Sequence, residues 1–170
     1  LWCHRHADLS CPVRSVATVV TPQLKAPVQL SAALIEAFAG TFLSVRYDDP
    51  RRTPEFHRTA WELYASEFPQ AGCVAPRDHA KSTGLTFDFI LAEVLFRVSD
   101  YVILISSTED KAAEQLSNIS DELQNNEDLI AEFGIKSFVV CGKTEIIVEM
   151  DDGWQFRILA RGAEQKIRGA

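Results

Sequence analysis

The sequence lacks long apolar runs and an excess of positive charge, and each absence excludes a class of protein. No apolar run approaches the ~20 residues that span a bilayer, so we expect no membrane helix. The 17 Lys and Arg residues are outnumbered by 24 Asp and Glu residues, which argues against a protein that coats nucleic acid with its whole surface. A local basic site remains allowed. With 170 residues, 46% of them hydrophobic, the chain can form one globular domain with its own core.

The four cysteines form no C-x-x-C pair, so the sequence predicts neither a zinc ribbon nor a disulfide framework. Two of them lie near His4 and His6, but their spacing matches no closed zinc motif. Residues 1–29 contain three prolines and no sustained hydrophobic period, which predicts a poorly ordered N-terminal arm. The chain begins at Leu1 without a signal-peptide pattern, and we expect it to be a fragment of a longer reading frame.

The hydrophobic pattern after residue 29 predicts helices that alternate with strands. An Asp-Gly turn between the strand-like runs 144–150 and 154–160 predicts a hairpin late in the chain. The other expected elements are helices over 31–42, 55–68, 81–99 and 107–125, a short helical turn that ends at Gly134, a short buried strand at 73–75, and a parallel strand covered on both faces at 101–105. This order predicts an α/β fold with a mainly parallel sheet flanked by helices.

The segment from Ala75 to Thr83 carries the clearest chemical signal. Its frame is G-x-x-x-x-G-K-[ST], with Ala75 and Ala80 in the two glycine places. Backbone N–H groups at the start of a helix point at a phosphate chain, and the helix dipole favours its negative charge. Lys81 would neutralise the β- and γ-phosphates, and the Ser82 hydroxyl would complete the shell of a Mg²⁺ ion. The pattern therefore indicates ATP and Mg²⁺, with an ordinary capped helix as the alternative.

This segment resembles the deviant phosphate loop of tailed-phage terminase large subunits, in which an alanine at the place of Ala80 is common. The resemblance covers roughly residues 30 to 170. Beyond the loop it extends through Phe56-His57, residues 101–110, 126–130, 156–162 and 166–169.

The resemblance implies a P-loop NTPase fold and an ATPase that drives double-stranded DNA into a procapsid. Residues 30–170 would be part of the ATPase domain, incomplete at its C-terminal end, and the family's nuclease domain would be absent. The implied partners are double-stranded DNA, the terminase small subunit, the portal and further copies in a ring, with no membrane. The implied location is the cytoplasm of the host cell during phage assembly.

The resemblance also assigns roles to residues. Lys81 would bind the phosphates, Ser82 would help hold Mg²⁺, and Arg77 would stabilise the charge that builds up on the γ-phosphate, because a guanidinium is planar and always charged. For Arg77 and His57 the alternatives are a solvent-exposed loop arginine and a histidine that packs its helix. The implied ATP-binding set is Phe56, His57, Pro76, Arg77, Asp78, His79, Ala80, Lys81, Ser82 and Thr83.

Two departures from the family pattern bear on activity. Asp78 stands where the family usually has glycine, and a carboxylate beside a triphosphate repels it, so we expect weakened nucleotide binding. The family's paired acids beyond the Arg-Gly segment are missing. The acids that the chain does have offer no convincing substitute: Glu109, Asp110, Glu145, Asp151 and Asp152. We therefore expect a fragment that binds ATP and hydrolyses it very slowly or not at all.

Charged segments outside the loop allow two further interpretations. Residues 109–132 contain eight acids and one base, which indicates a solvated acidic face. Arg161, Lys166 and Arg168 would either contact DNA phosphate or lie in a solvated loop. The rivals to a packaging motor are another helicase-like P-loop ATPase and a truncated, non-catalytic interaction module.

Overall fold

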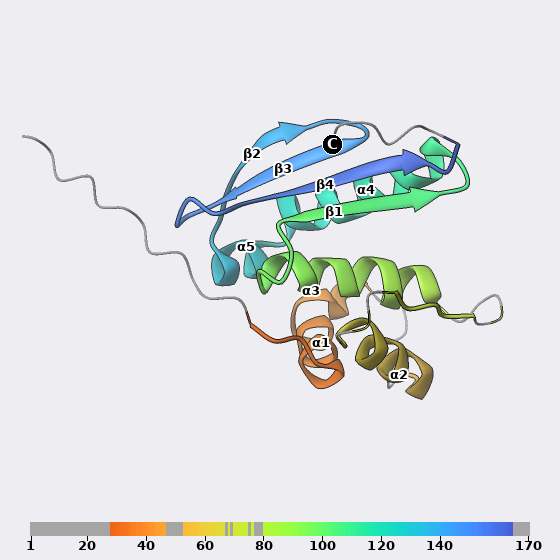
Figure 1. Cartoon of the computed structure of the whole chain (residues 1–170). Helices are drawn as coiled ribbons and strands as arrows, with labels where there is room; N and C mark the ends of the chain where they lie inside the picture. Colours follow the sequence, from red (N-terminus) through yellow and green to blue (C-terminus); the bar gives the residue numbers. More distant parts are fainter. Residues whose placement is uncertain are drawn as a thin grey trace, which may run out of the picture.

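The chain folds into a four-stranded sheet with its helices on one side, as Figure 1 shows. The structure, a computed structural model, describes residues 28–46, 53–66, 68, 70–74, 76 and 80–164. The 1–29 arm therefore lies outside the described residues, apart from its last two positions. Helix α4 (Glu109–Asn125) packs against the sheet, the continuous helix η3–α3 (Ser82–Asp88 and Phe89–Leu95) runs beneath it, and α1 (Ala32–Phe38) and α2 (Glu55–Tyr64) form the layer farthest from the sheet.

The strands follow the order β1-β4-β3-β2. They are β1 (Tyr101–Ser106), β2 (Ile135–Cys141), β3 (Glu145–Met150) and β4 (Gln155–Gly162). β1 and β4 are parallel, whereas β2–β3 and β3–β4 are antiparallel. In the described part of the chain the expectation of a mainly parallel sheet is therefore wrong. The reason is that the short turns between β2, β3 and β4 can join only antiparallel strands.

One predicted strand is absent, another differs from its predicted burial, and one strand of the structure was not predicted. Residues 73 and 74 form no strand, and Val74 is fully exposed, while Ala75 lies outside the described residues. β1 is parallel as predicted, but it is an edge strand among the described residues and its Ile105 is 57% exposed. The sequence analysis also missed β2, because register shifts at residues 135–137 and 138–140 interrupt its hydrophobic alternation.

The predictions that depend on local signals are confirmed. The Ser31 side chain caps α1 by accepting the Leu34 N–H at 3.2 Å. Asn126 ends α4 and caps α5 (Glu127–Phe133), and Gly134 then ends α5 with a φ of 73°. The hairpin turn at residues 151–153 also forms, with a φ of 84° at Gly153. α4 begins at Glu109, two residues later than expected, and Thr108 is its N-cap.

The predicted helices form with shifted ends. α1 continues as a π-helical turn, η1 (Ala39–Leu43), and a 3₁₀ turn, η2 (Ser44–Arg46). α2 ends at Tyr64, and just beyond it the Ser66 hydroxyl donates to the Leu63 carbonyl. The long apolar helix ends at Leu95, and Arg97 follows with a φ of 63°.

One hydrophobic core joins the layers. Alternate residues of β3 and β4 are buried between the sheet and α4, with Phe156 1% exposed. Phe38, Phe42, Phe96 and Phe133 form an aromatic cluster with ring centroids 5.5–5.8 Å apart, which connects α1 and η1 with the end of α3 and with α5. Among the described residues, no helix is both long and apolar enough to cross a bilayer.

Candidate functional site

The Lys-Ser-Thr motif lies at the start of the long helix η3–α3, as predicted. The first helical hydrogen bond runs from the Gly84 N–H to the Ala80 carbonyl at 2.9 Å. The N–H groups of residues 81–83 precede this bond and point out of the N-terminal end of the helix. Ser82 is exposed and Lys81 is half-buried. This helix end therefore presents donors and a hydroxyl to the solvent.

Ala80 adopts a φ of 48°, the left-handed region that favours glycine. It occupies the second glycine place of the phosphate-loop frame and comes directly before Lys81, whose φ is −55°. A left-handed residue followed by a right-handed one turns successive N–H groups into a concave surface suited to anions. The Lys81 ammonium donates to the Pro76 carbonyl, so its side chain points back along the chain from the start of the helix.

The start of η3 lies on the same side of the molecule as the carboxyl ends of β1 and β4 and the start of α4 (Figure 1). In α/β proteins ligands bind outside the carboxyl ends of parallel strands. The arrangement therefore places Ser82 on the side of the sheet where a nucleotide binds in such folds.

Gly84 allows α2 to approach this helix closely. A Cβ atom at residue 84 would lie 2.9 Å from the Cε1 and Nδ1 atoms of His57. The Trp61 indole N–H donates to the Gly84 carbonyl at 2.8 Å, and the Trp61 side chain is 2% exposed. The two contacts fix α2 against the first turn of η3. Sequence analysis did not identify Gly84, although a glycine directly after Lys-Ser-Thr inside a predicted helix is a signal for close packing.

Phe56 and His57, which the resemblance includes among the ATP-binding residues, are beside the start of η3. His57 is 6% exposed and its ring contacts Phe56 at 4.3 Å and Trp61 at 5.8 Å, measured between ring centroids. This burial favours the packing alternative for His57. Phe56 is half-buried, so part of its ring remains accessible next to the candidate site.

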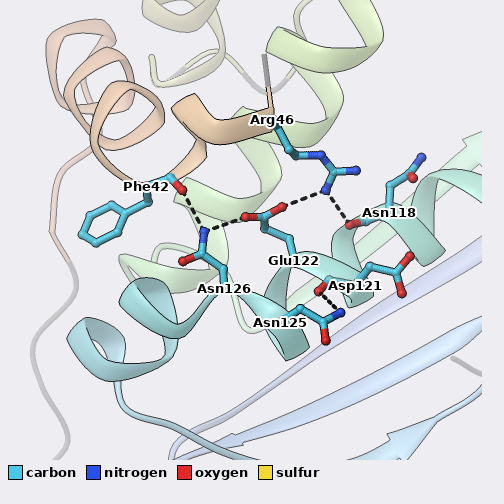
Figure 2. A network of polar contacts seen from close by, with 7 residues as sticks. All are labelled: Phe42, Arg46, Asn118, Asp121, Glu122, Asn125 and Asn126. Atoms are coloured by element: carbon cyan, nitrogen blue, oxygen red, sulfur yellow. Dashed lines mark hydrogen bonds and ion pairs between the residues drawn. The ribbon is translucent and has the colours of Figure 1, made fainter. Parts of the chain in front are cut away.

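A polar network connects the end of η2 with α4 and α5, as Figure 2 shows. The Arg46 guanidinium donates to the Glu122 carboxylate at 2.8 Å and to the Asn118 carbonyl at 3.2 Å. The Asn126 amide donates to the Glu122 carboxylate at 2.6 Å and to the Phe42 carbonyl at 2.7 Å. This network was not predicted, because Arg46 and Glu122 are 76 residues apart in sequence.

Arg46 also contacts the helix that carries the motif. Its guanidinium carbon lies 4.4 Å from the centroid of the Phe87 ring on η3. A cavity of about 140 Å³ beside it is lined by Ser82 and Thr83 from η3 and by Gln115 and Asn118 from α4. Arg46 therefore connects η3, through the Phe87 ring, with α4, through Glu122 and the Asn118 carbonyl.

Several predicted residues lie outside the described part of the chain. Arg77, Asp78 and His79 are among them, and so are Lys166 and Arg168. Arg161 is half-buried in β4, where its side chain donates to the Ala160 carbonyl at 3.0 Å. Arg161 is therefore a strand residue, which differs from the predicted solvated loop.

The acidic residues considered as substitutes for the missing pair are dispersed. Asp110 pairs with Lys143 at 2.9 Å, Glu145 with Arg157 at 2.7 Å, and Asp152 with Arg97 at 2.7 Å. The hydrogen bond from Lys143 holds the pKa of Asp110 below its usual value. Most acids of residues 109–132 are exposed, which confirms the predicted acidic face.

Comparisons with known proteins add no assignment. The chain matches no family model, no curated protein and no solved structure. Among the residues that the structure describes, no three His, Cys, Asp or Glu side chains gather in a way that could hold a metal ion. The case for a function therefore depends on the geometry around Ala80, Lys81 and Ser82.

Proposed function

We propose that the chain is the ATP-binding part of a terminase-type DNA-packaging motor. The observation that carries the proposal is the left-handed Ala80 in the glycine place directly before Lys81, at the open N-terminal end of a long helix. An alanine in the left-handed conformation costs free energy, so its presence in the fold calls for a functional reason. A concave set of N–H groups for a phosphate chain supplies that reason.

In this proposal the residues divide the work by their chemistry. The N–H groups of residues 81–83 bind phosphate oxygens, and the Lys81 ammonium exchanges its contact with the Pro76 carbonyl for one with phosphate. Ser82 offers its exposed hydroxyl to Mg²⁺ held mainly by the nucleotide, which requires no cluster of carboxylates. Bound Mg²⁺ would neutralise charge on the phosphates.

The same proposal assigns DNA translocation to the intact motor. ATP hydrolysis there needs acids that orient water, whereas Asp110, Glu145 and Asp152 are occupied by Lys143, Arg157 and Arg97. The chain by itself is therefore a nucleotide-binding unit with little or no turnover. Double-stranded DNA, a small subunit, a portal and ring neighbours belong to the motor as a whole.

A non-catalytic interaction module is the second candidate. The observation in its favour is the irregular chain before the loop, where Cys73 and Val74 form no strand and Val74 is fully exposed. In a P-loop ATPase a strand delivers the loop to the helix. A module of this kind would fold cooperatively and bind no nucleotide.

The test is a titration with a fluorescent ATP analogue and Mg²⁺, with Lys81→Ala as the variant and Lys111→Ala as the matched control. Lys111 is an exposed lysine in the first turn of α4, so the control removes the same charge from a different helix. We expect saturable binding, at least about tenfold weaker in Lys81→Ala and unchanged in Lys111→Ala. No binding by a chain that melts cooperatively would select the non-catalytic module.

A second variant tests the loop itself. Asp78→Gly removes the carboxylate expected to repel phosphate and is expected to tighten binding. Equal affinity of the wild type and this variant would contradict the expected repulsion. The role of Lys81 would still be decided by the titration of Lys81→Ala.

A further inference from the structure

A groove of about 420 Å³ lies toward the opposite end of the η3–α3 helix from the candidate nucleotide site. It is bounded by the segment before α1, the end of α2 and the outer side of α3. The lining includes Val28, Leu30, Tyr64, Phe89, Glu93 and Val98. Glu93 follows Lys81 by twelve residues, which is about 18 Å along a helix axis. The groove is therefore separate from the proposed phosphate site.

Among the described residues that line the groove, Glu93 is the only charged one. In the described part of the chain, its carboxylate makes no hydrogen bond and no ion pair. Burial raises the pKa of Glu93 above its usual value. A partly desolvated carboxylate without a cation is unfavourable, and an incoming positive charge would offset that cost.

The walls of the groove are apolar and aromatic. The Tyr64 and Phe89 rings meet edge to face with centroids 5.4 Å apart. Val28 and Val98 are 46% and 48% exposed, so the apolar walls reach the solvent. Walls of this kind suit the aliphatic stem of a long cationic side chain, while an aromatic ring and a carboxylate suit its head.

We propose that this groove binds an arginine side chain of a partner polypeptide. The arginine stem packs on Val28 and Val98, and its guanidinium pairs with Glu93 against the ring of Phe89 or Tyr64. Arginine fits better than lysine because a planar guanidinium stacks on aromatic rings and is less strongly hydrated. The net charge of −7 of the whole chain favours the approach of a basic segment.

The experiment uses the full chain labelled with ¹⁵N and titrates it with N-acetyl-L-arginine amide. N-acetyl-L-citrulline amide is the matched ligand, because its urea group has nearly the shape of guanidinium without the charge. We expect saturable amide shifts at Val28, Tyr64, Glu93 and Val98 with the arginine compound. The citrulline compound is expected to bind at least about tenfold more weakly.

Two protein variants locate the charge that is recognised. Glu93→Gln keeps the shape of the side chain and is expected to weaken binding at least about tenfold, whereas Glu62→Gln on the exposed face of α2 leaves it unchanged. Val98→Lys places a cation at the groove and is expected to abolish binding. Equal binding of the citrulline compound, unchanged binding by Glu93→Gln, or shifts that follow the acidic face of α4 would each overturn the proposal.

The folding of Glu93→Gln is checked by its thermal transition. The folded state raises the pKa of Glu93, so it holds a proton more tightly than the unfolded state does. The stability that this residue contributes is thus fully present below its unfolded pKa and is lost as the pH rises through its folded pKa. Glu93→Gln is therefore expected to melt at a higher temperature than the wild type at pH 7, with the difference disappearing near pH 4. A failure of the ATP titration would leave this result untouched.

Discussion

The sheet with α4 and the pair formed by α2 and η3 are stabilised in different ways. In the sheet half, buried side chains recur along β3 and β4. When one of them is truncated, its neighbours therefore keep many other apolar contacts. Between α2 and η3, a few specific contacts at Gly84 set the geometry: the His57 ring against the backbone and the Trp61 N–H on the carbonyl. The π-helical first turn and the left-handed Ala80 belong to this second region.

The difference explains where function can be separated from stability. Burial of apolar area is non-directional, so the sheet half tolerates exchange among residues of similar volume. The close approach of a ring to a glycine has no such tolerance, because one added carbon at Gly84 overlaps the His57 ring. Substitutions in the sheet half are therefore expected to lower stability alone, whereas substitutions at Gly84 are expected to lower both stability and nucleotide affinity.

The largest effect is expected in the sheet half, for Phe156→Ala. Phe156 is 1% exposed between the sheet and α4, and truncating such a ring costs about 3–5 kcal/mol in unfolding free energy. Denaturant unfolding measures the loss. The nucleotide affinity of the molecules that remain folded is expected to stay unchanged, and a change in that affinity would contradict the separation of the two regions.

Gly84→Ala is expected to cost about 1–3 kcal/mol, because the new methyl group meets the His57 ring at 2.9 Å. Nucleotide binding should weaken as well, since the first turn of η3 must move. Gly40→Ala is the matched control: a Cβ at residue 40 has no atom within 4 Å, so this variant should be neutral or slightly stabilising. Equal losses in the two variants would show that the approach of His57 is not the cause.

Arg46→Ala is expected to cost about 1–2 kcal/mol, because it removes the pair with Glu122, whose side chain is 10% exposed, and the contact with Phe87. Arg58→Ala is the control, since Arg58 pairs with the more exposed Glu36 at 2.6 Å and is expected to cost about 0.5 kcal/mol. A double-mutant cycle of Arg46→Ala with Glu122→Gln measures the coupling. A coupling energy of zero would show that the ion pair between Arg46 and Glu122 does not contribute to stability.

The smallest effect is expected for Ala80→Gly, and it has the opposite sign. Glycine adopts a φ of 48° without strain, so the variant should be more stable by about 1 kcal/mol and bind nucleotide at least as well. Ala131→Gly, in the exposed part of α5, should instead be less stable by about 1 kcal/mol. Destabilisation by Ala80→Gly would mean that this backbone does not carry the strain described above.

The parts of the fold that could be predicted depend on neighbouring residues. Ser31, Asn126 and Gly134 act within four residues of their own position, so caps and ends can be inferred from local sequence. Strand order and direction could not be inferred in this way. β1 pairs with β4 although α4, α5 and two strands lie between them in the chain. A single turn signal predicts one antiparallel pair and does not fix the order or direction of the other strands.

The candidate site was predicted in the same uneven way. Lys81 and Ser82 could be identified because the phosphate-loop frame spans only the eight residues 75–82. The residues that hold this frame in place were missed or given another role. Arg46 meets Glu122 and Phe87 from distant positions. For His57 the sequence left nucleotide binding and helix packing open, and its ring lies against Gly84.

The sequence by itself determined the approximate extents of the helices, the end of α5 at Gly134, the late hairpin and the place of Lys81 at the start of a helix, because each follows from residues close together in the chain. Only the tertiary structure decided the direction of the strands, the approach of α2 to Gly84 and the place of Glu93 in its groove. These depend on contacts between residues far apart in the chain, whose loop-closure cost and packing are set by the whole fold.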